Sequence, residues 1–83
     1  MINAEVRKMT DYDVYTYAEL QLRHWRARGF NFEDEETVRC SLATWIDIGL
    51  KHGFTVHEAY PAFEKALAKI REENALRKQN RNP

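Results

Sequence analysis

The feature that most constrains this chain is a set of apolar side chains that recur every three or four residues in three separate stretches. Such spacing places the apolar side chains on one face of an α-helix. Gly29 and Gly53 follow the first two stretches, and a glycine just beyond a helix can take the left-handed conformation that ends it. We therefore predict an all-α fold, a compact three-helix domain.

The first predicted helix covers residues 11–28. Thr10 and Asp13 form the Ser/Thr-x-x-acid arrangement that caps a helix start. The arginines that precede Gly29 suit the negative end of the helix dipole. The core-facing stripe of this helix consists of Val14, Ala18, Leu22 and Trp25, with Tyr15 beside it.

The second predicted helix is capped by Asn31 and ends at Gly53, with four carboxylates at residues 33–36 in its first turn. Negative charge is favourable there because the helix dipole is positive at its start. Gly49 lies inside this helix, where glycine costs about 1 kcal/mol relative to alanine, so we expect it to allow another helix to approach closely. The core stripe consists of Val38, Leu42, Trp45, Ile46 and Gly49.

The third helix has the clearest start in the chain. Thr55 and Glu58 form a capping box, and Phe54 with Ala59 fits the hydrophobic staple around it. Pro61 has no amide hydrogen, so we expect the helix to be bent or broken there, with its main part continuing from Pro61. The buried stripe is predicted at Tyr60, Phe63, Ala66, Leu67 and Ile70. A single core that joins the three helices is predicted from Trp25, Leu42, Trp45, Phe63, Leu67 and Ile70.

The two ends of the chain are predicted to be extensions of one domain that spans residues 1–83. In residues 1–9, Ile2, Ala4 and Val6 alternate with polar residues, a period typical of a half-buried strand. No second strand is visible, so such a strand pairs only with another chain. The helical core is expected at residues 10–76, and the apolar-free stretch 77–83 is expected to be a flexible basic tail.

Charge and cysteine content limit the partners and the compartment. Lys+Arg and Asp+Glu number 13 each, so no overall field steers the chain to nucleic acid or membrane. Cys40 is the only cysteine and has no partner for a disulfide within the chain. No apolar run reaches the length of a membrane span, and the start lacks the layout of a signal peptide. We therefore expect a cytoplasmic protein.

The residues that carry enzyme chemistry are not arranged for it. His24, His52, His57 and Cys40 lack the spacing of a zinc site. The three glycines are too far apart to cradle a phosphate. The carboxylates at 33–36 are better explained as a solvated first helical turn than as an acid–base pair. We expect no catalytic residue, cofactor or metal, and a protein that is not an enzyme.

A second row of side chains runs along the first helix beside its core stripe. Asp13, Tyr17, Leu20 and His24 recur at spacings of 4, 3 and 4, with arginines nearby, and tyrosine and arginine often dominate binding interfaces. The predicted partner-binding residues are Tyr17, Leu20, Arg23, His24, Arg26 and Arg28. Alternatively this helix is sandwiched and the row belongs to the core. The arginines and the carboxylates at 33–36 can also neutralise each other across the turn.

The function expected from these features is a non-catalytic protein-binding module. It is a small regulator, adaptor or inhibitor of a larger macromolecular machine, of the kind that phages and mobile elements encode. Another protein is the expected partner, and a homodimer is compatible with the sequence.

The alternative is a dimeric DNA-binding regulator. The order of alternating strand, helix, glycine turn and helix over residues 2–51 resembles the ribbon-helix-helix layout. That resemblance implies that Asn3, Glu5 and Arg7 face the bases. The long first helix, the four carboxylates at 33–36 and the zero net charge disfavour it, because DNA binding needs a basic footprint.

Overall fold

The computed structural model describes the backbone of residues 11–81 and the side chains of residues 14–78. The chain forms three helices there, α2 (Asp11–Ala27), α3 (Glu35–Lys51) and α4 (Val56–Arg81), and residues 11–81 contain no strand. The predicted all-α, three-helix fold is confirmed. The strand predicted within residues 1–9 lies outside the described residues.

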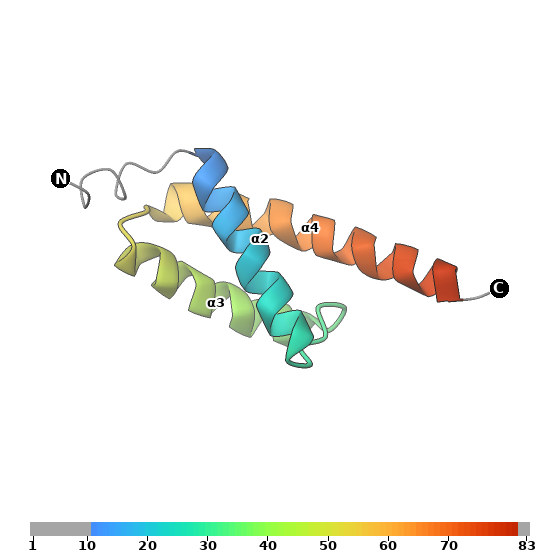
Figure 1. Cartoon of the computed structure of the whole chain (residues 1–83). Coiled ribbons are helices and arrows are strands. Elements are labelled where there is room, and N and C mark those ends of the chain that lie inside the picture. Colours follow the sequence, from blue (N-terminus) through green and yellow to red (C-terminus); the bar gives the residue numbers. More distant parts are fainter. Residues whose placement is uncertain (1–10, 82–83) are drawn as a thin grey trace.

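Helix α4 organises the fold (Figure 1). Helix α2 crosses it, and α3 is joined to its start by a short turn, so that α2 and α3 each pack mainly against α4 and approach each other closely at few points. With 26 residues, α4 is about 39 Å long at the usual helical rise. Its C-terminal part projects beyond the other two helices, and the molecule measures 52 × 24 × 21 Å.

Side chains from all three helices meet in one hydrophobic core. Of the six side chains predicted to form it, Trp45, Phe63 and Ile70 are fully buried. The other three are half-buried and pack against the same cluster; they are Trp25, Leu42 and Leu67.

The core also contains side chains that the stripes did not include. Phe32 is fully buried although it lies in the turn between α2 and α3, and Arg71 Nε donates a hydrogen bond to its carbonyl oxygen at 3.0 Å. On α4 the small residues Ala59 and Ala62 face the core, whereas Tyr60, predicted to do so, is exposed. Small side chains at these positions let neighbouring helices approach α4 closely.

The predicted turns and the capping box are present. Gly29 and Gly53 have φ angles of 106° and 92°, which are left-handed values that favour glycine. The Glu58 amide donates to Thr55 Oγ1 at 3.3 Å, and the Thr55 amide donates to Glu58 Oε1 at 2.8 Å. Gly49 also has the expected role, because a Cβ atom there would lie 3.2 Å from Cβ of Ala59. Helices α3 and α4 therefore touch almost backbone to backbone at Gly49.

The predicted cap of α3 is wrong. Asp34, not Asn31, is the N-cap, and its carboxylate accepts a hydrogen bond from the Thr37 amide at 3.0 Å. Asn31 Oδ1 instead accepts from the Glu33 amide at 3.0 Å, which forms a side-chain turn ahead of the helix. Asparagine and aspartate are both common N-cap residues, so residue type alone does not decide which of the two caps the helix.

A bend or a break was predicted at Pro61. The break is wrong, because α4 continues through Pro61 without interruption, and the bend stays a prediction. Pro61 lies in the second turn of α4, where it removes one backbone hydrogen bond, to the carbonyl of His57. Both residues are exposed, so water can hydrate that carbonyl. At its other end α4 reaches Arg81, so residues 77–81 are helical. The flexibility predicted for this end of the chain stays a prediction.

None of the helices within residues 11–81 combines the length and the apolar character that crossing a membrane requires.

Candidate partner-binding surface

The six residues predicted to bind a partner all lie on or just after α2, but the structure divides them into two groups. Three of them contact other helices, namely Tyr17, Arg23 and Arg26. The other three are exposed, namely Leu20, His24 and Arg28.

Tyr17 belongs to the contact between α2 and α3. Its ring is half-buried and lies edge-on to the ring of Trp45, with centroids 5.2 Å apart at 82°. Its hydroxyl is 2.9 Å from Nε2 of His52, which lies at the C-cap of α3. Tyr17 therefore packs against the core, as the alternative prediction for the row Asp13, Tyr17, Leu20 and His24 stated.

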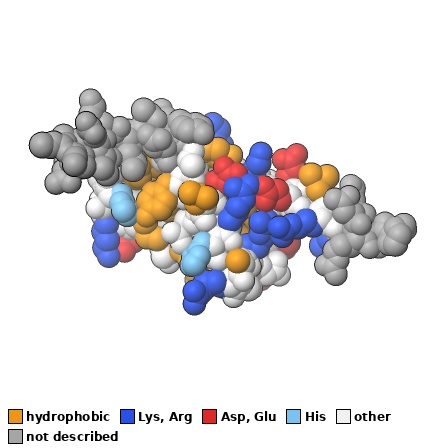
Figure 2. All heavy atoms as spheres, in the orientation of Figure 1, with side chains coloured by type: hydrophobic (Ala, Val, Ile, Leu, Met, Phe, Trp, Pro, Cys, Tyr) orange, Lys and Arg blue, Asp and Glu red, His pale blue; other side chains and the backbone are white. Residues whose placement is uncertain are grey.

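Arg23 and Arg26 join α2 to the second half of α4. Arg23 donates a hydrogen bond to Glu73 and forms an ion pair with Glu19 at 2.7 Å. Arg26 Nη1 lies 3.1 Å from Glu73 Oε1 and 3.2 Å from Asn74 Oδ1. The hydrogen bond from Arg23 has the largest effect on the pKa of Glu73 and lowers it below its ordinary value. Burial opposes this effect, and the hydrogen bond from Arg26 adds to it. Figure 2 shows the resulting cluster of basic and acidic side chains where α2 crosses α4.

The carboxylates at residues 33–36 make different contacts from those expected. Asp34 caps α3, and Glu36 lies 3.4 Å from Arg39 on the same helix. None of the ion pairs among the described side chains joins these carboxylates to Arg23, Arg26 or Arg28. The basic end of α2 is balanced by Glu73 on α4, a residue that the sequence pattern did not single out.

Leu20, His24 and Arg28 form a row of exposed side chains, here called the exposed row. They are four residues apart, so they lie roughly one above the other on the helix surface. The Arg28 amide still donates to the His24 carbonyl at 3.2 Å, so the helical turn extends to Arg28. Leu20 is 58% exposed. Among the described side chains, neither His24 nor Arg28 has a hydrogen-bond or ion-pair partner.

The face of the molecule that α2 crosses has an apolar part and a charged part. In Figure 2, hydrophobic side chains gather over α2 and the adjoining end of α3, close to a histidine, and the acidic and basic cluster lies on the side of α4. An apolar patch with a polar border is typical of protein–protein contact surfaces.

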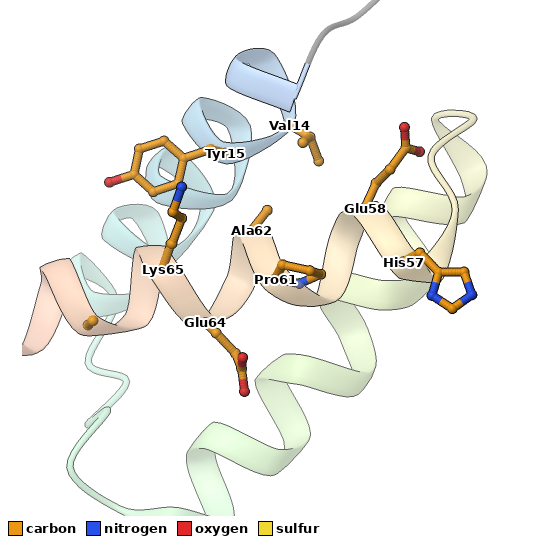
Figure 3. A pocket seen from close by; sticks show the side chains of 9 residues that line it. Val14, Tyr15, His57, Glu58, Pro61, Ala62, Glu64 and Lys65 are labelled. Atoms are coloured by element: carbon orange, nitrogen blue, oxygen red, sulfur yellow. The ribbon is translucent and has the colours of Figure 1, made fainter.

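A groove lies between the first turns of α2 and the first half of α4, with a volume of about 660 Å³ (Figure 3). Val14 and Ala62 point between the two helices, and Lys65 Nζ lies 5.7 Å from the centre of the Tyr15 ring. The carboxylate of Glu64 points away from α2. The charged groups of this groove do not converge on a common point, so it shows no recognisable ligand chemistry.

Neither metal ligation nor thiol chemistry is indicated by the described side chains. Within that part of the chain, no group of three or more His, Cys, Asp or Glu residues is placed to hold a metal ion. Cys40 is exposed on α3, and its Sγ lies 4.0 Å from Glu36 Oε2.

Comparisons of the chain with models of protein families, with curated proteins and with solved structures give no match.

Proposed function

We propose that this chain is a protein-binding module and that the exposed row on α2 is the centre of its contact surface. The observation that carries the proposal is Leu20, a large apolar side chain that is 58% exposed in the middle of α2. The opposite face of the same helix already supplies the core through Val14, Ala18 and Leu22. Leu20 is therefore not needed to hold α2 in place.

The two groups of side chains have different roles in this proposal. Leu20, His24 and Arg28 touch the partner, and Tyr17, Arg23 and Arg26 hold α2 against α3 and α4 so that the exposed row is presented on a rigid helix. A surface that does not rearrange on binding avoids part of the entropy cost of association.

The biological role that we propose is that of a cytoplasmic, non-catalytic regulator, adaptor or inhibitor that acts by occupying a surface of a larger assembly. The DNA-binding alternative depends on Asn3, Glu5 and Arg7, which lie outside the described residues. No contact within residues 14–78 favours that alternative.

The proposal is tested by capture from a lysate of the source cells with wild-type protein and two leucine variants. Leu20→Glu places a charge in the exposed row, and Leu76→Glu makes the same change at a leucine of similar exposure (52%) on α4. We expect a protein that is retained by the wild type and by Leu76→Glu but is lost with Leu20→Glu, while circular dichroism shows all three folded. Equal retention by both variants would place the contact surface elsewhere.

A further inference from the structure

We infer that this chain forms a symmetric dimer in which the basic end of α4 from each copy occupies an acidic hollow beside the α2–α3 turn of the other copy. The basic end is defined here as residues 74–81 of α4. The acidic hollow is the one lined by Phe30, Asp34 and Glu36. The inference goes beyond the proposed function, because neither surface includes a residue of the exposed row.

The acidic hollow combines an aromatic wall with carboxylates. Its volume is about 470 Å³, and no basic residue lines it. Phe30 is 39% exposed, and its ring stacks on the ring of Trp25 with centroids 5.6 Å apart, so the aromatic wall is supported from inside the fold. A guanidinium or ammonium group suits such a hollow, because it can pair with a carboxylate and pack on an aromatic ring.

The carboxylates at this turn are not neutralised by the described part of the chain. Glu33, Asp34 and Glu35 are exposed, and none of them forms an ion pair with a described side chain. Arg28 precedes them in the chain but forms no ion pair with them either. The turn therefore has an excess of negative charge that basic side chains from another molecule complement.

The basic end of α4 has the opposite charge. Residues 74–83 contain three basic residues and neither aspartate nor glutamate. Arg77 and Lys78 are exposed and form no ion pair with a described side chain. Glu72 lies five residues before Arg77 and therefore points to another side of the helix, which it shares with Leu76. The face formed by Arg77 and Lys78 is thus basic and available for a carboxylate.

The basic end lies beyond the α2–α3 turn of its own chain. Arg71 contacts that turn through the carbonyl of Phe32, but Arg77 follows six residues later, roughly 9 Å further along the axis of α4. There α4 projects past the other two helices (Figure 1). A second copy in the opposite direction brings each basic end to the acidic hollow of the other copy. Two-fold symmetry then makes the same contact twice, which adds to the stability of the dimer.

Sedimentation velocity over a range of protein concentrations, at low and at high salt, tests the dimer. Two charge-reversal variants are used, Arg77→Glu/Lys78→Glu in the basic end and Glu33→Lys/Glu36→Lys at the acidic hollow. Each variant alone should raise the dissociation constant of the dimer at least about tenfold, because like charges then meet at both contacts. High salt should weaken the wild-type dimer, because it screens exposed charges. Circular dichroism checks that each variant is folded.

An equal mixture of the two variants gives the sharpest result. In a mixed dimer both contacts again join opposite charges, so the mixture should dimerise about as tightly as the wild type. Lys65→Glu/Lys69→Glu is the matched control, since it makes the same change in net charge at exposed positions of α4 outside the basic end. This control should dimerise as the wild type does. Mixed with Glu33→Lys/Glu36→Lys, it should pair at least about tenfold more weakly than the basic-end variant, because one of the two contacts then joins like charges.

Four other results would overturn the inference. A wild type that stays monomeric at every concentration would exclude the dimer, and a dimer that neither variant weakens would use another surface. Weakening by each variant without recovery in the mixture would show that the basic end and the acidic hollow do not meet. If the control recovers pairing as well as the basic-end variant, net charge and not this contact causes the recovery. Binding of a labelled DNA duplex by a monomeric wild type, lost with Arg77→Glu/Lys78→Glu, would make a nucleic acid the ligand of the basic end.

Discussion

At the scale of single residues, Trp45 connects all three helices. Its side chain is fully buried, its ring packs against Tyr17 of α2, and its indole Nε1 donates to the carbonyl of Ala59 on α4 at 2.8 Å. A buried indole N–H needs such an acceptor, because leaving it without one would cost free energy. Trp45 thus contributes both apolar area and a specific hydrogen bond to the core.

Replacement of Trp45 by alanine should therefore lower the free energy of unfolding by about 3–5 kcal/mol. A loss of that size is comparable with the whole stability of many small domains. Urea unfolding followed by circular dichroism measures it, with Leu50→Ala as an exposed control on the same helix. A Trp45→Ala variant within 1 kcal/mol of the wild type would show that the core is not organised around this residue.

The sequence predicted the burial of Trp45 but not the position of Tyr17. Trp45 lies on a stripe of apolar side chains, so helical periodicity alone assigns it to the core. Tyr17 lies beside its own stripe, and whether such a residue is covered depends on where the neighbouring helix lies. His52, which covers it, is 35 residues away in the chain, and no local pattern contains that information.

At the scale of helices, the sequence predicted the N-cap correctly where only one residue before the helix could act as the cap. Thr55 is the one cap-forming side chain directly before α4, so the capping box was predicted correctly. Before α3, Asn31 and Asp34 compete for the cap. The buried side chain of Phe32 lies between them in the turn that precedes α3, and the helix starts only after Asp34. Burial of Phe32 is a tertiary contact, which explains why sequence alone chose the wrong cap.

Pro61 provides a test at the same scale. Because α4 runs through Pro61 with the loss of one backbone hydrogen bond, Pro61→Ala should restore that bond and raise the free energy of unfolding by about 1–2 kcal/mol. This is less than the full cost of about 3 kcal/mol for a proline in a helix, because proline also restricts the unfolded chain. Thermal unfolding with calorimetry measures the change, and Ala68→Gly, at an exposed site on the same helix, should shift it in the opposite direction. An unchanged or lower stability of Pro61→Ala would contradict this account, because the missing hydrogen bond would then cost the folded chain nothing.

At the scale of the whole molecule, the ionic contacts between α2 and α4 determine how α2 is held. The lowered pKa of Glu73 means that its carboxylate stabilises the folded chain above the ordinary value of 4.5. This stabilisation should be lost as the pH falls through the lowered folded-state pKa. In the part-exposed setting of Glu73, the contribution at neutral pH should be at most about 1 kcal/mol.

Urea unfolding of wild type and Glu73→Gln across pH tests this account. The wild type should be more stable at pH 7, and the difference should shrink towards zero as the solution is acidified. Glu72→Gln, a change at an exposed neighbour, is the matched control and should show no such pH-dependent difference. A difference between wild type and Glu73→Gln that stays constant down to the lowest pH at which the chain is folded would contradict the role of the carboxylate charge.

The central claim is that the exposed row on α2 is available for binding because the fold does not need it. The most direct measurement is the free energy of unfolding of the triple variant Leu20→Ala/His24→Ala/Arg28→Ala. Exposed substitutions usually change stability by no more than about 0.5 kcal/mol each, so we predict a value within about 1.5 kcal/mol of the wild type and an unchanged dependence on denaturant. A loss as large as that expected for Trp45→Ala would contradict the claim, because the row would then be part of the core.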